Sequence, residues 1–308
     1  MRLASLAEVV RGRLLNSPSV SFVNRFVFEA GRVRQGDCFI ALDEDANALQ
    51  AALKNGAYAV IFAGEAALRD TEIGWIRVKS FDRALLGLLR FLLVQKEPPV
   101  FYTDAVGVAL AKAYIRDGAF FASDNLKTAI ERLQQPGPAP AFLLDRASAL
   151  MEAAPEAAPL NQAPLPLLRE RLFETWLQGE NGPVKLPVSS LFAPQLSQVA
   201  ALARDRRLAL VWHTHPVALP RFEPIAMPRG DRLLIFDRAE SDEAEAALAF
   251  LKQMAPWAKI WVPGQSDPKA LADALIAQPF QYAYLNKQDK NAVLEALEAA
   301  RPQTPSLF

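Results

Sequence analysis

The sequence predicts an α/β protein, and three observations lead to this prediction. Short apolar runs typical of buried strands alternate with amphipathic helical segments near the beginning and the end of the chain. The middle is less regular, because four prolines interrupt residues 152–168. Strands that alternate with helices favour partly parallel sheets, and the alternation in the last part of the chain predicts a small doubly wound domain.

The first part of the chain contains a complete set of α/β signals. Gly56 follows a helical segment in the position of a C-terminal cap, and Ser80 or Asp82 is placed to cap the next long helix at its N-terminus. The predicted strands are 38–42, 57–63 and 75–80, and the predicted helices are 5–15, 46–55 and the segment that ends at Val94. The paired prolines of 96–100 then favour an extended linker.

The middle and last parts differ in how clearly they are patterned. In the middle we expect helices over 102–115, 123–134 and 195–208, a turn and strand over 136–144, and a hairpin over 174–189 around the turn Gly179–Gly182. In the last part we expect strands over 208–215, 231–237, 258–264 and 281–286, and helices over 239–254, 268–278 and 290–300. The predicted domains are therefore 1–96, 97–211 and 212–308.

Charge and cysteine content limit the class of protein. Lys+Arg and Asp+Glu are both 34, so the formal net charge is zero, which argues against a surface built to bind nucleic acid or anionic lipid. The single cysteine, Cys38, lies in an apolar run and is expected to be a buried, inert thiol of a reducing compartment. The longest apolar stretch, Ala84–Val94, contains Arg90 and is too short to span a bilayer. With no secretory signal visible at the N-terminus, the expected location is the cytoplasm.

Two neighbouring segments of the first part resemble a known family. GRVRQGDCFIAL, Gly31–Leu42, is followed by AALKNGAYAVIF, Ala51–Phe62. Together they resemble the N-terminal domain of the Mur ligases, whose pattern is DSRxVxxGDLFVAL, a Gly-His loop, a helix and a KGAxAVV strand. The branches that add the third amino acid or the D-alanyl-D-alanine dipeptide are most similar. A weaker resemblance continues through 177–203, 229–251 and 258–265. The positions that match the pattern are Val33, Gly36, Asp37, Phe39, Ala41, Leu42, Gly56, Ala57 and Val60.

The resemblance implies an ATP-dependent ligase of peptidoglycan precursors, but the residues for that chemistry are missing. The family holds ATP phosphates with a GxxGK[ST] loop after the first strand of its central domain, where this chain has VFYTDAVGVALAKAY with only Gly107 and the helical Lys112. The family's Asp-Ser-Arg is replaced by residues 29–31, its Gly-His loop by 43–47, and its Asn-rich adenosine loop by 238–241. We therefore expect a pseudoenzyme without a nucleotide cofactor or a metal.

Four residues are candidates for a residual ligand or partner contact. Arg32 and Arg34, together with Arg25, surround the family-like loop near Asp37, and arginines in such a place bind a diphosphate or an acidic partner, or simply pair with neighbouring carboxylates. The fourth candidate, Asp237, ends a predicted strand, where open α/β sheets place ligands. The acidic helix start that follows it disfavours phosphate and fits the helix dipole instead.

The only histidines, His213 and His215, share one face if 208–215 is a strand. A metal would need a third ligand such as Glu223 or Asp237, so partly buried histidines without metal are the simpler interpretation. Likewise, Trp257 and Trp261 fit core packing or a protein interface.

Three functions remain open on the sequence alone. The first is a non-catalytic protein that binds a partner such as a Mur ligase or a cell-wall morphogenesis protein. The second is a divergent ligase, and the third is a sensor of UDP-sugar peptides. The link to peptidoglycan or to cell shape depends on the family resemblance alone, because a fold does not determine a function.

Overall fold

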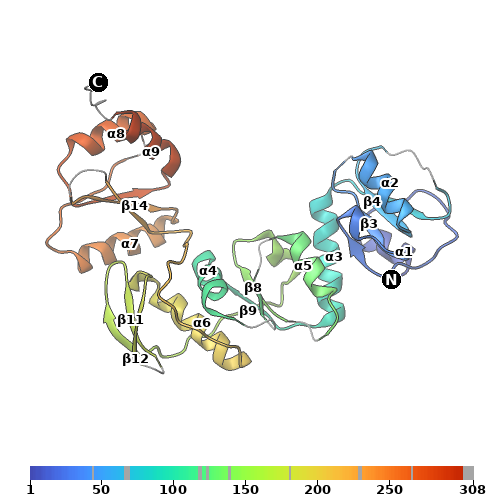
Figure 1. Ribbon diagram of the computed structural model, residues 1–308, viewed down its shortest axis with the longest axis horizontal. Coiled ribbons are helices and arrows are strands. Elements are labelled where there is room, and N and C mark those ends of the chain that lie inside the picture. The colour runs from blue at the N-terminus through green and yellow to red at the C-terminus, as the bar shows by residue number, and fades with distance from the viewer. Residues whose placement is uncertain are drawn as a thin grey trace, which may run out of the picture. The chain divides into compact units, whose positions relative to one another are not determined.

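The computed structural model is a mixed α/β structure (Figure 1) and describes residues 1–43, 45–65, 70–116, 120–122, 125–137, 140–179, 182–227, 231–264 and 266–300. The chain forms two compact units. The first comprises Met1–Asp104 and Asp117–Leu160, and the second comprises Ala105–Arg116 and Asn161–Phe308. The division at 96 and 211 into three domains remains a prediction.

The first unit begins with a five-stranded sheet. Its order is β1 (Arg13–Leu14), β5 (Gly74–Arg77), β4 (Ala59–Phe62), β3 (Cys38–Ile40) and β2 (Phe26–Val27), in which only β1 is antiparallel to its neighbour. The helices are α1 (Leu3–Val9), α2 (Ala46–Lys54) and α3 (Phe81–Lys96), and η1 (Ala30–Arg32) is a 3-10 turn. The strands predicted at 38–42, 57–63 and 75–80 are thus confirmed. Ser80 caps α3 and Asp45 caps α2, while Gly56 follows α2 with φ +92°.

The helix predicted over 5–15 was too long. It ends at Val9, and Arg11 takes a left-handed conformation with φ 50°. Gly12 then approaches β5 so closely that a Cβ there would lie 2.7 Å from Ile76 Cγ2. Arg13 and Leu14 then form the edge strand β1, which pairs with β5. A helix continued through these residues would leave the backbone groups on this side of β5 without partners.

Both faces of this sheet are covered. On one face α2 packs over Phe39, Val60 and Trp75. The core of the other face extends from α1 and α3 to the second sheet of the unit and its helix α5, and includes Leu6, Ile76, Leu88, Leu92, Ile130, Leu133 and Phe142. The second sheet is parallel, in the order β7 (Phe120–Ala122), β8 (Ala141–Asp145), β6 (Val100–Thr103) and β9 (Ala158–Pro159), with α5 (Leu126–Leu133) and η2 (Ala149–Ala153) beside it. The helices predicted over 102–115 and 123–134 are present but shorter.

The second unit contains a helix pair, a hairpin sheet and the C-terminal sheet. The helices α4 (Ala105–Tyr114) and α6 (Ala193–Arg206) pack together, with η3 (Ser190–Phe192) leading into α6. The antiparallel sheet is β10 (Leu167–Glu170), β11 (Thr175–Gly179) and β12 (Gly182–Leu186). The predicted hairpin is confirmed by the pairing of Gly179 with Gly182, although the two residues between them lie outside the described part of the chain.

The C-terminal sheet has the order β13 (Glu223–Ala226), β14 (Leu233–Asp237), β16 (Tyr282–Asn286) and β15 (Ile260–Trp261), with β13 antiparallel and the others parallel. Helices α8 (Pro268–Ala277) and α9 (Lys290–Ala299) cover one face and share its core. Helix α7 (Ser241–Met254) lies on the opposite side (Figure 1). This agrees with the α/β order expected for 231–300.

The strand predicted over 208–215 was wrong. Only Leu210 pairs, in an isolated bridge with Ile115 just after α4. The neighbouring backbone groups also bond to the end of α4, since Val211 N donates to Tyr114 O at 2.8 Å and Arg116 N donates to Ala209 O at 2.9 Å. This apolar segment therefore packs as a connection against a helix end, and the C-terminal sheet starts later, at β13.

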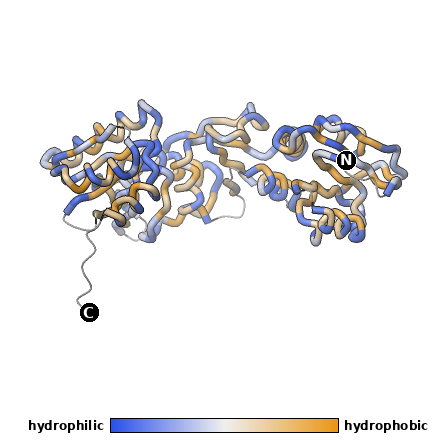
Figure 2. Tube along the Cα trace, turned by 90° about the horizontal axis from the view of Figure 1, so that it is seen from above, coloured by the Kyte–Doolittle hydropathy of each residue, from blue (hydrophilic) through white to orange (hydrophobic). Residues whose placement is uncertain are grey.

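Apolar and polar residues are interspersed along the described trace (Figure 2). Among the described residues, we find no helix that combines the length and the apolar character required to cross a membrane.

Candidate functional site

A cavity of about 610 Å³ opens beside the edge strand β2 in the first unit. One wall comes from the loop around β2 and η1 and from the end of α2, and the other comes from the end of α5. The lining residues are Arg25, Phe26, Val27, Gly31, Arg32, Val33, Arg34, Asn55, Glu131, Gln134, Gln135 and Pro136. Three arginines and one glutamate belong to this lining. Arg25 is paired with Asp37 and Arg32 loosely with Glu29, so Arg34 is the main group for a ligand carboxylate or phosphate.

Asp37 organises the arginine side of the cavity. Its buried carboxylate accepts hydrogen bonds from Arg25 Nε at 3.1 Å and Arg25 Nη2 at 2.6 Å. It also accepts from the backbone N–H of Arg34 at 2.9 Å. The hydrogen bond with Asp37 raises the pKa of Arg25. Asp37 therefore fixes one arginine directly and the backbone of a second, and its own charge is compensated within the protein.

Arg32 and Arg34 are exposed at the cavity. The guanidinium of Arg32 lies 3.8 Å from Glu29, a loose and solvated pair. Within the described part of the chain, the guanidinium of Arg34 has no ion-pair partner. The structure thus brings together three of the four residues selected from the sequence, Arg32, Arg34 and Asp37, whereas Asp237 belongs to the other unit. Cys38, next to Asp37, is fully buried, and burial raises the pKa of its thiol, as expected of an inert cysteine.

Gln134, at the C-terminal end of α5, joins the two walls of the cavity. Its Oε1 accepts from Phe26 N at 2.6 Å, and its Nε2 donates to Phe26 O at 3.1 Å. The same Nε2 lies 3.2 Å from Ile130 O. The side-chain amide therefore imitates one residue of an additional strand at the open edge of β2, which attaches α5 to the first sheet.

We expect Gln134→Glu to destabilise the first unit by about 1–3 kcal/mol, because a carboxylate oxygen would replace the donor that faces two backbone carbonyls. Urea unfolding of the full chain measures the effect. Gln135→Glu is the matched control, since it introduces the same charge at the next, exposed position and keeps an acceptor for Arg132. Equal unfolding midpoints for the two variants would show that the amide pairing contributes little.

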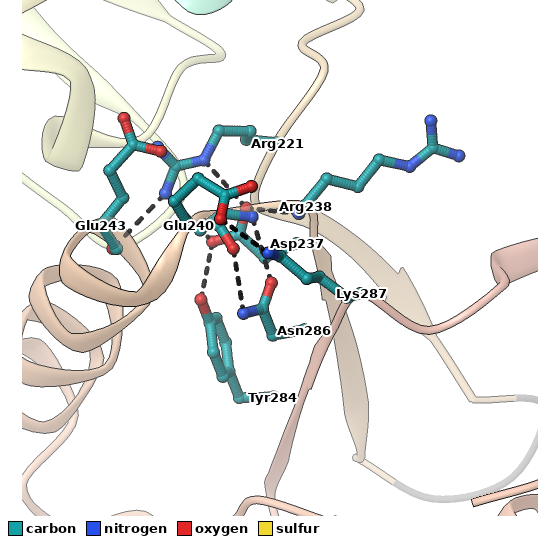
Figure 3. A network of polar contacts seen from close by, with 9 residues as sticks. Arg221, Asp237, Arg238, Glu240, Glu243, Tyr284, Asn286 and Lys287 are labelled. Atoms are coloured by element: carbon teal, nitrogen blue, oxygen red, sulfur yellow. Dashed lines mark hydrogen bonds and ion pairs between the residues drawn. The ribbon is translucent and has the colours of Figure 1, made fainter. Parts of the chain in front are cut away.

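Asp237, the fourth candidate, lies at the carboxyl end of β14 in a network of polar contacts (Figure 3). Arg221 Nε donates to Oδ1 at 3.0 Å and Nη2 reaches Oδ2 at 3.4 Å, while Tyr284 Oη donates to Oδ2 at 2.7 Å. The backbone N–H of Arg238 adds a hydrogen bond to Oδ1 at 2.8 Å. Arg221 also forms an ion pair with Glu243 of α7 at 2.6 Å.

The surroundings of this network raise two pKa values. Burial raises the pKa of Tyr284, and the hydrogen bond to Asp237 raises it further. Burial alone would lower the pKa of Arg221, but its hydrogen bond and its attraction to Asp237 outweigh burial and raise it. The carboxylate of Asp237 is thus occupied by donors of the protein itself. A cavity of about 290 Å³ lies beside it, and the guanidinium of Arg238 points away from the network (Figure 3).

The segment that would have to hold ATP phosphates is very short. Strand β6 ends at Thr103 and α4 begins at Ala105, so Asp104 alone connects them. Gly107 is buried inside α4, and Lys112 is an exposed residue of the same helix. A phosphate cradle needs several consecutive backbone N–H groups in a glycine-rich loop between strand and helix. The chain has no length for such a loop at this point.

The two histidines are close together without a strand. Their ring centroids are 5.4 Å apart. Within the described part of the chain, no group of three or more His, Cys, Asp and Glu side chains is arranged to hold a metal ion. Of the two tryptophans considered for an interface, Trp257 is 71% exposed, whereas Trp261 stacks on Phe280 with ring centroids 5.8 Å apart.

Sequence reasoning missed Gln134, Asn55, Arg221 and Tyr284. Asn55 Nδ2 donates to Ala30 O at 3.0 Å and so holds η1 against the end of α2. Each of the four meets its partner through the folded structure; Asn55 lies in the family-like segment Ala51–Phe62 but not at a position that matches the pattern, and the other three lie in no recognisable motif. Only Tyr284 carried a signal, because it lies within a predicted strand that ends beside the one ending at Asp237.

No family model matches the sequence, and no curated protein matches it in sequence. Solved structures do match. A MurF ligase from Thermotoga maritima, determined in complex with ADP, is 14% identical, covers 90% of this chain and 97% of its own, and gives a TM-score of 0.52. A MurF from Acinetobacter baumannii is 13% identical, with 97% and 98% covered and a TM-score of 0.47. At such identities the similarity concerns the fold, and the chain has the Mur ligase-like α/β fold that its N-terminal segments predicted.

Proposed function

We propose that this protein is a non-catalytic relative of the Mur ligases that acts by binding, in the cytoplasm, in peptidoglycan precursor synthesis or the control of cell shape. The observation that carries the proposal is the single-residue connection between β6 and α4. Phosphoryl transfer needs backbone donors, a lysine and a magnesium-binding hydroxyl around the phosphates. Asp104 alone offers one backbone N–H and neither a lysine nor a hydroxyl, and its carboxylate would repel a phosphate.

The protein partner that we favour is a Mur ligase or a cell-wall morphogenesis protein, because binding requires only the surface of the fold. The arginine-lined cavity of the first unit supports a second candidate, a sensor of UDP-sugar peptides. Such ligands carry a diphosphate and carboxylates, and Arg34 is free to form charge-assisted hydrogen bonds with either group. The cavity is also open to an acidic segment of a protein partner.

Calorimetric titration of the full chain with ATP–Mg²⁺ and, separately, with a UDP-muramyl peptide tests these functions. We expect no binding of ATP. Binding of the UDP-peptide without phosphate release supports the sensor, and binding of neither compound supports the protein-binding function. Clear ATP binding with phosphate release would overturn the non-catalytic proposal and favour the divergent ligase.

If the UDP-peptide binds, Arg34→Ala is expected to weaken its affinity about ten- to a hundredfold, because one charge-assisted hydrogen bond contributes about 1.5–3 kcal/mol. Arg90→Ala is the matched control, since Arg90 is an exposed arginine of α3 that does not line the cavity. An equal loss of affinity in both variants would place the ligand elsewhere.

A further inference from the structure

The segment that connects α6 to the C-terminal sheet lies against the end of α4, within one compact unit. Trp212 and His213 lie beside Tyr114, with ring centroids 4.8 Å from the tyrosine ring in both cases. His215 follows two residues later, and its ring centroid is 5.4 Å from that of His213. The only two histidines of the chain are therefore adjacent at one place, next to a fully buried tyrosine.

The hydrogen bond of His213 defines its tautomer. Its Nε2 lies 3.2 Å from the backbone carbonyl oxygen of Ala113, and a carbonyl oxygen only accepts hydrogen bonds. Nε2 therefore carries the hydrogen, and in the neutral ring Nδ1 has a free lone pair. This is the arrangement that metal-binding histidines use, because a carbonyl on one nitrogen orients the ring and makes the other nitrogen a better ligand.

Two polar atoms of this cluster are buried without a partner. In the described part of the chain, neither His213 Nδ1 nor Tyr114 Oη has a hydrogen-bond partner. An orphaned lone pair and an orphaned hydroxyl are each costly in the interior of a protein, and a bound water or ion is one way in which such groups are satisfied. The two atoms belong to neighbouring aromatic rings, whose centroids lie 4.8 Å apart.

The distance between the two histidine rings fits a shared ion. A tetrahedral metal binds imidazole nitrogen at about 2.0–2.1 Å, and the ring centre lies roughly 1.1 Å beyond the nitrogen, so two rings on one ion have centroids about 5 Å apart. The observed separation is 5.4 Å. Imidazole ligands suit Zn²⁺, Ni²⁺ and Cu²⁺ and not the hard ions Mg²⁺ and Ca²⁺.

We propose that His213 Nδ1 and His215 bind one borderline divalent transition-metal ion, with Zn²⁺ as the representative case. Water completes the coordination, and the hydroxyl of Tyr114 donates a hydrogen bond to a water ligand. Because the described residues supply only two protein ligands, the ion exchanges more readily than in a structural zinc site with four protein ligands.

Equilibrium dialysis of the full chain, free of any histidine tag, against Zn²⁺ tests the site, with Mg²⁺ as the hard-ion control. We expect one Zn²⁺ per chain and no Mg²⁺. His213→Ala and His215→Ala should each lower the affinity by more than about tenfold, and Tyr114→Phe should keep the stoichiometry with a smaller loss. Circular dichroism verifies that each variant folds.

The wild-type protein alone supplies a second measurement. Its complex with Cu²⁺ should give an electron paramagnetic resonance spectrum with coupling to two imidazole nitrogens. Absence of Zn²⁺ binding in the wild type, or equal binding by the wild type and both histidine variants, would overturn the proposal. A copper spectrum with oxygen ligands only would do the same, even if a histidine variant failed to fold.

Discussion

Arg221→Met is expected to lower the free energy of unfolding of the second unit by about 3–5 kcal/mol, because it leaves a buried carboxylate without its counter-charge. The side chain of Asp237 is fully buried, and that of Arg221 is only 14% exposed. Methionine fills much of the same volume, so the loss of charge dominates over the loss of packing. Tyr284 and the backbone N–H of Arg238 remain as neutral donors and do not replace the charge.

Urea unfolding followed by tryptophan fluorescence measures this effect. Arg238→Met is the matched control, because it removes a neighbouring but exposed guanidinium and is expected to change stability by less than about 0.5 kcal/mol. The double variant Arg221→Met, Asp237→Leu should recover a large part of the loss, since replacing a whole buried pair by apolar groups is often neutral. A loss in Arg221→Met no larger than in the control would mean that solvent, and not Arg221, compensates Asp237.

The contacts of Asp237 show why its position at a strand end was predictable from the sequence, whereas the residues around its carboxylate were not. A strand that ends in an acidic residue is visible in the sequence, and so is the helix that follows it. Arg221 precedes it by 16 residues in a proline-containing connection without periodicity. No local pattern indicates that this arginine returns to the strand end, so the sequence did not show which donors occupy the carboxylate of Asp237.

The first unit was more predictable because its signals are local. Runs such as 38–40 and 59–62 are apolar throughout, as strands covered on both faces must be, and capping residues mark the helix ends. Arg32, Arg34 and Asp37 came together because they are close in sequence. The opposite wall of their cavity was not predicted, since Gln134 meets Phe26 across 108 residues through a polar amide.

The wrong strand at 208–215 has a different cause. A short apolar run such as residues 208–212 indicates burial, and it does not specify what buries it. Here the end of α4 takes the place of a sheet, and Ala113 and Tyr114 supply the backbone acceptors. A short apolar run that packs on a helix end has the same sequence pattern as one that pairs in a sheet.

Gly87→Ala is expected to destabilise the first unit by about 1–3 kcal/mol or more, against the helix propensity of alanine. Gly87 lies inside α3, where alanine is intrinsically better than glycine by about 1 kcal/mol. A Cβ at this position would however lie 2.2 Å from the backbone carbonyl oxygen of Val9, at the end of α1. A backbone atom cannot turn aside as a flexible side chain does, so α1 and α3 would have to separate.

The sign of the change in the free energy of unfolding therefore distinguishes the steric effect of close helix packing from the helix propensity of alanine. Gly31→Ala is the reference variant. A Cβ at Gly31 meets no atom within 4 Å, so that variant should change stability by less than about 0.5 kcal/mol. Comparing the urea unfolding midpoints of Gly87→Ala, Gly31→Ala and the wild type tests which effect dominates. If Gly87→Ala were more stable than the wild type, α1 would have to move away from α3 at little cost in free energy. The core between the two helices would then be less tightly packed than the buried Leu6 and Leu88 indicate.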